Sequence, residues 1–94
     1  MTEPELEIVD NPEENRFEAR LDGRVVGHSA YELGESRITF LHTETDPALK
    51  GRGIGSQLAA GALESARSRG FKVRSQCPFM TAYLRRHPEY ADLR

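Results

Sequence analysis

Apolar and polar residues alternate through the first half of the chain, which is the pattern of half-buried β-strands. Two short candidate strands come first, with apolar faces formed by Leu6 and Ile8 and by Phe17, Ala19 and Leu21. A polar cluster at residues 11–15 predicts a turn between them, and Asp22 with Gly23 predicts a two-residue hairpin turn with left-handed φ values. Antiparallel pairing is therefore expected.

Two further strands are predicted over residues 24–33 and 37–45, where Asp46 and Pro47 end the second because proline lacks an amide donor. Strict alternation in the second places one set of side chains on one face, namely Ile38, Phe40, His42 and Glu44. The other face then carries Thr39, Leu41 and Thr43. The four strands form a meander.

The period of the pattern changes after residue 53. Apolar residues at four-residue spacing predict an amphipathic helix over residues 54–69, and Gly70 is a natural stop. Residues 71–77 alternate again and predict a fifth strand, parallel to the fourth through a right-handed crossover. A final helix is expected over residues 79–86, before His87 and Pro88 break it. The predicted class is α+β: a four-stranded antiparallel meander, a helix, a parallel fifth strand and a short last helix.

The 94 residues have room for one domain, spanning 1–94, and 37% hydrophobic with 30% charged residues is typical of a soluble globular protein. No apolar run is long enough to cross a bilayer and the acidic N-terminus has no leader pattern, so a cytoplasmic protein without membrane contact is expected. The single cysteine, Cys77, excludes an internal disulfide and a metal site of several thiolates, and no metal is predicted.

Charge is distributed unevenly along the chain. Residues 1–49 carry 4 basic and 12 acidic residues, whereas residues 50–94 carry 9 basic and 3 acidic ones. The basic half suggests an anionic ligand, and the alternative is an ordinary solvated surface.

Three glycines interrupt the chain between the fourth strand and the helix, at Gly51, Gly53 and Gly55, beside Lys50 and Arg52. Unpaired amides and the positive end of the helix dipole favour an anion there, and glycines allow a pyrophosphate to approach the backbone. The loop lacks the Gly-Lys-Ser/Thr ending of a P-loop and the full G-x-G-x-x-G of a dinucleotide site. A flexible glycine turn is the structural alternative.

The loop resembles the acetyl-CoA loop of the GNAT superfamily, Arg/Gln-x-x-Gly-x-Gly/Ala, with Lys50 in the first place. Further marks are His42-Thr43-Glu44, Cys77-Pro78-Phe79, Tyr83 and the run from His87 to Tyr90, and they are similar to very small GNAT-like proteins with a cysteine in the acetyl-CoA site. The resemblance implies an N-acetyltransferase that binds acetyl-CoA along residues 49–56. The cofactor contacts that it implies are Thr43, Glu44, Thr45, Lys50, Gly51, Arg52, Gly53, Ile54, Gly55, Ser56, Cys77, Pro78, Tyr83 and Arg86.

Two mechanisms are open. In one, Cys77 accepts the acetyl group as a thiolate after His42 takes its proton, and then passes it to an amine. In the other, a neutral amine attacks acetyl-CoA directly, with His42 or Glu44 removing the proton through a water, and Cys77 only lines the pocket. Either residue can also be structural, Cys77 as a small buried hydrophobe and His42 as a hydrogen-bonded core histidine.

Tyr83 lies where larger GNAT enzymes place the tyrosine that protonates the departing CoA thiolate, or it is a packing aromatic. Arg86 and its neighbour Arg85 are candidates to reach CoA phosphates, or they cap a helix end. The predicted acceptor of the acetyl group is an amine. One possibility is an amine on a macromolecule such as a protein. The alternatives are a CoA-binding module without turnover and a nucleic-acid binder, and no recognition motif supports the latter.

Overall fold

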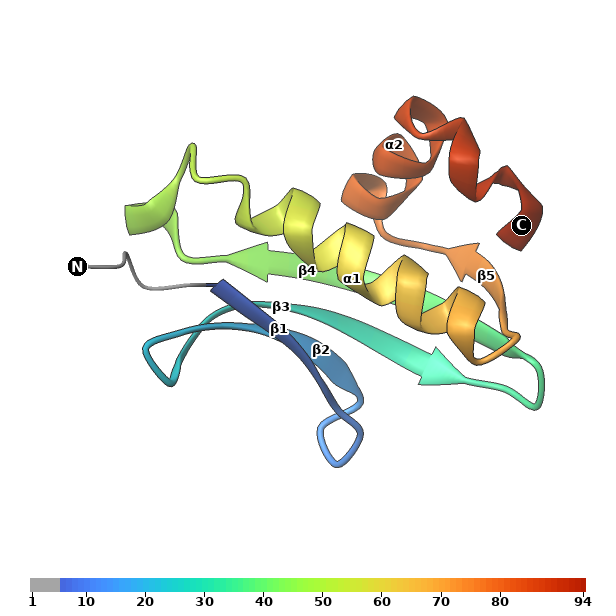
Figure 1. Ribbon diagram of the computed structural model, residues 1–94, viewed down its shortest axis with the longest axis horizontal. Helices are drawn as coiled ribbons and strands as arrows, with labels where there is room; N and C mark the ends of the chain where they lie inside the picture. Colours follow the sequence, from blue (N-terminus) through green and yellow to red (C-terminus); the bar gives the residue numbers. More distant parts are fainter. Residues whose placement is uncertain (1–5) are drawn as a thin grey trace.

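The structure is a computed structural model that describes residues 6–94. A five-stranded sheet is formed by β1 (Leu6–Asn11), β2 (Arg16–Leu21), β3 (Arg24–Leu33), β4 (Arg37–Thr45) and β5 (Lys72–Ser75). The helices are α1 (Ile54–Ser68) and α2 (Pro78–Arg86), with short 3-10 segments η1 (Pro47–Leu49) and η2 (Pro88–Leu93). The strands lie side by side in chain order, antiparallel from β1 to β4, with β5 parallel to β4 (Figure 1). This confirms the predicted class and topology. From the sequence, no leader is expected in the acidic N-terminus. Part of that segment, residues 1–5, lies outside the described residues.

The local signals set most element boundaries. The hairpin between β2 and β3 uses left-handed backbone at Asp22 (φ 52°) and Gly23 (φ 78°), as predicted. Strand β5 is shorter than expected because Cys77 is already the N-cap of α2 and Pro78 occupies its first turn. The segment η2 was not predicted as an element.

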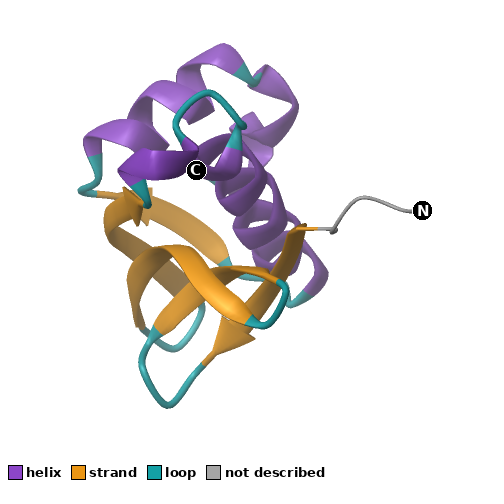
Figure 2. Cartoon of the chain, turned by 90° about the vertical axis from the view of Figure 1, so that its left-hand side faces the viewer, coloured by secondary structure: helices purple, strands orange, loops and turns teal. Residues whose placement is uncertain are grey.

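Helices cover one face of the sheet and leave the other face open (Figure 2). The buried stripe of α1 carries Leu58, Ala62 and Leu63, which belong to one core cluster with Phe17 and Phe40 of the sheet. All five are between 0% and 3% exposed, so α1 and the sheet bury their apolar faces against each other.

A β-bulge in β4 overturns the predicted faces of that strand. Ala30 pairs with His42 but Tyr31 pairs with Phe40, so Leu41 is an extra residue. Ile38 and Phe40 are buried under α1, whereas the exposed His42 lies on the open face with Glu44. The expectation that all four share one face is wrong, because an extra residue inverts the alternation beyond it.

Candidate functional site

The glycine loop leads directly into α1. Gly51 and Gly53 have φ values of +89° and +72°, in the left-handed region where side chains are strained. Gly53 is the N-cap of α1 and makes no side-chain cap bond, and the Gln57 amide donates to the Gly53 carbonyl at 3.0 Å. The amides of Ile54, Gly55 and Ser56 precede that bond, so this end of a 15-residue helix presents hydrogen-bond donors and partial positive charge.

A hollow of about 440 Å³ lies over this loop. It is lined by Thr43, Thr45, Leu49, Lys50, Gly51, Gly53, Ile54, Gly55, Ser56 and Phe79. Three separate segments therefore build it, namely the end of β4, the loop with the first turn of α1, and the start of α2. Its lining includes the cationic Lys50 and has no carboxylate, which suits an anion.

The hollow brings together a large part of the cofactor set expected from the sequence. The predicted residues that line it are Thr43, Thr45, Lys50, Gly51, Gly53, Ile54, Gly55 and Ser56. Those that do not are Glu44, Arg52, Cys77, Pro78, Tyr83 and Arg86. Glu44 lies on the open face and Arg52 is an exposed residue of the loop, while Cys77 and Pro78 begin α2 and Tyr83 and Arg86 lie further along it.

Phe79 is a lining residue that was not among the predicted contacts. Its ring is 41% exposed and rests on Gly55, where a Cβ atom would lie 2.8 Å from Phe79 Cζ. A side chain at position 55 would therefore displace the Phe79 ring from this wall. The available signal was a large apolar residue in the first turn of α2, a position that usually carries polar side chains at a surface.

Strands β4 and β5 separate beside the hollow. Their register ends at Phe40 with Ser75, and the last bond joins the Gln76 amide to the Phe40 carbonyl at 2.8 Å. Beyond this point β5 stops and the chain enters α2, while β4 continues to Thr45. The β5-facing edge of β4 is thus unpaired next to the glycine loop, and its backbone can bind an extended polar ligand.

Cys77 lies at this separation, on the helix side of the sheet. Its thiol is 1% exposed, donates to Thr43 Oγ1 and accepts the Met80 amide, both at 3.4 Å. Thr43 Oγ1 in turn donates to Ser29 Oγ at 3.2 Å. The cysteine is therefore brought to Thr43, and His42 points to the opposite face.

On the open face, His42 forms a small cluster with His28 and Glu44. The rings of His28 and His42 meet edge to face at 5.6 Å, and His28 Nε2 is 3.8 Å from Glu44 Oε2. Burial lowers the pKa of His28, helped by the charge of Arg16. A neutral His28 leaves the exposed His42 beside an uncharged neighbour at neutral pH.

Tyr83 of α2 lies against the aromatic residues that follow this helix. Its ring stacks on His87 at 3.9 Å and lies 6.2 Å from the ring of Tyr90. Burial, followed by the charges of Glu89 and Glu64, raises the pKa of Tyr83, so the phenol stays protonated. Arg86 is exposed in the last turn of α2 and does not reach the hollow.

A protein-family model described as GCN5-related N-acetyl-transferase matches residues 16–93. The chain belongs to this family. The match spans β2 to η2 and so includes the glycine loop, the separated strands and Cys77. It confirms the resemblance to the GNAT superfamily that the loop and the Cys77 segment indicated.

Two individual relatives agree with this GNAT assignment. Protein NATD1 of Xenopus tropicalis is 30% identical over 76 residues, which cover 78% of this chain and 69% of that protein. The NMR solution structure of a GCN5-like protein from Staphylococcus aureus has a TM-score of 0.72 and 27% identity, covering 94% of this chain and 86% of that one. The GNAT fold therefore extends over nearly the whole chain.

Within residues 6–94, no helix is long and apolar enough to span a membrane. The same residues contain no group of three or more His, Cys, Asp or Glu side chains placed to hold a metal ion.

Proposed function

We propose that this protein is an N-acetyltransferase that takes its acetyl group from acetyl-CoA and transfers it to an amine. The observation that carries the proposal is the hollow at the start of α1, where free helical amides, Lys50 and glycine backbone face the unpaired edge of β4. Membership of the GCN5-related family supports the same reaction.

The residues present fit CoA chemically. The donors of Ile54, Gly55 and Ser56 suit pyrophosphate oxygens, and a side chain at Gly53 or Gly55 occupies the approach to the backbone or collides with Phe79. The open edge of β4 offers backbone partners for the amide groups of the pantetheine arm. When bound, acetyl-CoA supplies a thioester whose carbonyl carbon forms a bond to the amine nitrogen as the C–S bond breaks and CoA leaves as a thiol.

His42 is the proposed base. It is exposed on the open face of β4, where an amine can approach without crossing α1, and it lies one residue from Thr43, which lines the hollow on the helix side. The imidazole accepts the proton that the amine loses, directly or through a water. Glu44 shares this face and contacts His28 rather than the hollow.

Direct transfer fits the placement of Cys77 better than an acetyl-cysteine intermediate. The thiol is buried, and its hydrogen and a lone pair are used by Thr43 and Met80. The recorded acceptor of the Cys77 thiol hydrogen is Thr43 Oγ1 and not His42, the base that a cysteine route requires. In the proposed mechanism Cys77 positions the start of α2 against β4.

The test measures CoA binding by calorimetry and acetyl transfer by release of free thiol, with lysine-containing and N-terminal amine peptides as acceptors. His42→Gln is expected to lower turnover by about 100-fold while CoA affinity stays unchanged, because general-base catalysis contributes about 10²-fold or more. Glu13→Gln, at an exposed position in the turn between β1 and β2, is the control and keeps wild-type turnover. Absence of CoA binding contradicts the proposed ligand, and CoA binding without transfer to any amine favours a binding module.

A further inference from the structure

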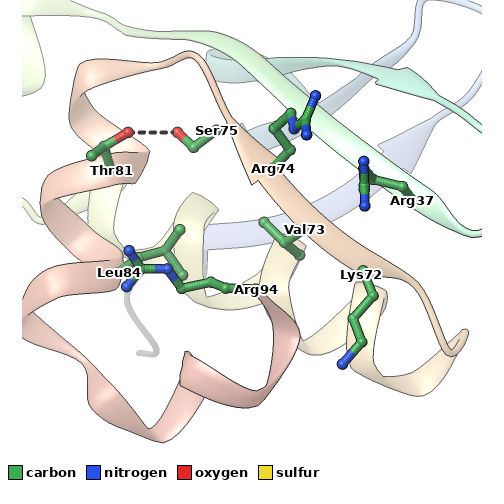
Figure 3. A pocket seen from close by; sticks show the side chains of 8 residues that line it. All are labelled: Arg37, Lys72, Val73, Arg74, Ser75, Thr81, Leu84 and Arg94. Atoms are coloured by element: carbon green, nitrogen blue, oxygen red, sulfur yellow. Dashed lines mark hydrogen bonds between the residues drawn. The ribbon is translucent and has the colours of Figure 1, made fainter.

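A second hollow adjoins β5 and is lined by residues of β4, β5 and α2 together with Arg94. Its volume is about 440 Å³, and its lining residues are Arg37, Lys72, Val73, Arg74, Ser75, Thr81, Leu84 and Arg94 (Figure 3). None of the residues that line the CoA hollow contributes to it. It is therefore a separate surface.

The backbone of β5 is paired along one edge only. The Lys72 amide donates to Ser36 O at 2.9 Å and the Gln76 amide to Phe40 O at 2.8 Å, both toward β4. Successive backbone groups of a strand point to alternate edges, so the peptide groups of Val73 and Ser75 point outward. In the described sheet β5 is the last strand, and no other strand covers that edge.

Basic side chains flank this edge. The hollow is lined by four cationic side chains, those of Arg37, Lys72, Arg74 and Arg94, and by no Asp or Glu side chain. The ion pairs recorded within residues 6–94 involve none of the four, although Lys72 donates to the Asp92 carbonyl oxygen. Glu32 lines a smaller adjoining hollow with Arg37 and Arg74, and the carboxylate of Asp92, whose carbonyl oxygen accepts from Lys72, is paired with Arg67.

The two sides of β5 differ in chemistry. Arg37 and Arg74 lie on one side of the strand, whereas Leu84 and Arg94 lie on the other, beside Thr81, whose hydroxyl is 2.9 Å from Ser75 Oγ (Figure 3). One wall is thus purely cationic, and the other combines an apolar side chain with a cation. An added strand, whose side chains alternate, faces both walls at once.

We propose that the outer edge of β5 binds an extended acidic segment of a partner polypeptide, which joins the sheet as a further strand. Its backbone pairs with the outward peptide groups of Val73 and Ser75. Its acidic side chains lie against Arg37 and Arg74, and the alternate apolar ones lie against Leu84. Basic residues on an edge strand oppose pairing with basic or identical strands, so the same charges give selectivity for acidic segments.

This inference does not depend on acetyl transfer, because it concerns neither the CoA hollow nor His42. The probe is a fluorescein-labelled peptide of four Glu-Val repeats, with a Lys-Val peptide of the same length as control, and the readout is fluorescence anisotropy with the full chain. The Glu-Val peptide is expected to bind and the Lys-Val peptide not. Arg37→Glu with Arg74→Glu should weaken binding by about tenfold or more, since close opposite charges across an interface become like charges. The control, Arg24→Glu with Arg85→Glu, changes the net charge equally outside the hollow and should bind as wild type.

Strand addition is separated from simple charge attraction by two N-methylated probes, one methylated at every Glu and one at every Val. In an extended strand every second residue directs its amide to the same edge, so all Glu amides face one edge and all Val amides face the other. The probe that is methylated on the amides facing β5 should lose binding, and the other probe should retain it. Lack of Glu-Val binding, equal binding by the two isomers, or equal effects of the two charge-reversal pairs would each overturn the proposal. CoA affinity, measured in the same variants, stays at the wild-type value.

Discussion

The thiol of Cys77 donates to Thr43 Oγ1 across 3.4 Å, and this contact joins the start of α2 to the part of β4 that borders the hollow over the glycine loop. Because Cys77 is also the N-cap of α2, through the Met80 amide, one side chain fixes both the helix start and its distance from β4. The contact explains why a cysteine lies beside the proposed acetyl site without facing His42.

Cys77→Ala is expected to lower the free energy of unfolding by about 1 kcal/mol, the usual cost of losing an N-cap side chain. CoA affinity should stay within about threefold of wild type, less than the tenfold that 1.4 kcal/mol represents, because Cys77 does not line the hollow. Intact-protein mass spectrometry after incubation with acetyl-CoA should show no hydroxylamine-labile adduct. An adduct present in wild type and absent in Cys77→Ala would restore the acetyl-cysteine route.

Gly53→Val is expected to abolish CoA binding, and Gly23→Val is its matched control. Both glycines have positive φ, +72° and +78°, and in neither case does an added Cβ meet an atom within 4 Å. Each substitution should therefore destabilise the protein by about 1 kcal/mol or more through backbone strain. Only Gly53 borders the hollow, so calorimetry should show lost CoA binding in that variant alone. Normal CoA binding by folded Gly53→Val would refute the loop assignment.

Glu18 is expected to make stability depend on pH in the acid range. The carboxylate is 2% exposed, and its pKa is lowered from 4.5 to about 2, first by the hydrogen bond from Arg20 and then by Arg16 and Asn11, against the opposing effect of burial. A lowered pKa stabilises the fold fully above pH 4.5, and this contribution is lost as the pH falls toward 2.

The measurement is urea unfolding of wild type, Glu18→Gln and the exposed control Glu13→Gln between pH 7 and pH 3. Glu18→Gln should be the least stable at pH 7, and its deficit should shrink below pH 4.5. If the stability difference between wild type and Glu18→Gln stayed constant with pH, Glu18 would stabilise the fold through packing rather than through its charge.

Gly61→Ala should destabilise the contact between α1 and β1. A Cβ atom at this position would lie 2.8 Å from Ile8 Cγ2 and 3.2 Å from Ile8 Cβ, which outweighs the helix preference of about 1 kcal/mol for alanine. In a double-mutant cycle with Ile8→Ala, the combined loss should be smaller than the sum of the single losses. If the two losses of stability were additive, the added methyl group would not collide with Ile8, because β1 would shift away from α1 at no cost in free energy.

The sequence by itself determined the order and type of the main elements and the place of the glycine loop before α1. Both follow from local sequence patterns. These patterns are the alternation in the strands, the four-residue repeat of α1, the left-handed turn at Asp22 and Gly23, and the glycines before a helix. These signals depend on a few adjacent residues and do not need the rest of the fold.

The tertiary structure decided which chemistry-bearing side chains meet. The bulge at Leu41 moved His42 to the open face, and no residue near it marks an extra residue in the strand. Two further features join residues that are distant in the chain. One is the wall of the hollow that Phe79 forms over Gly55, and the other is the basic edge made by Arg37, Arg74 and Arg94. Such contacts follow from the register between strands and from helix packing, which only the assembled sheet and its helices fix.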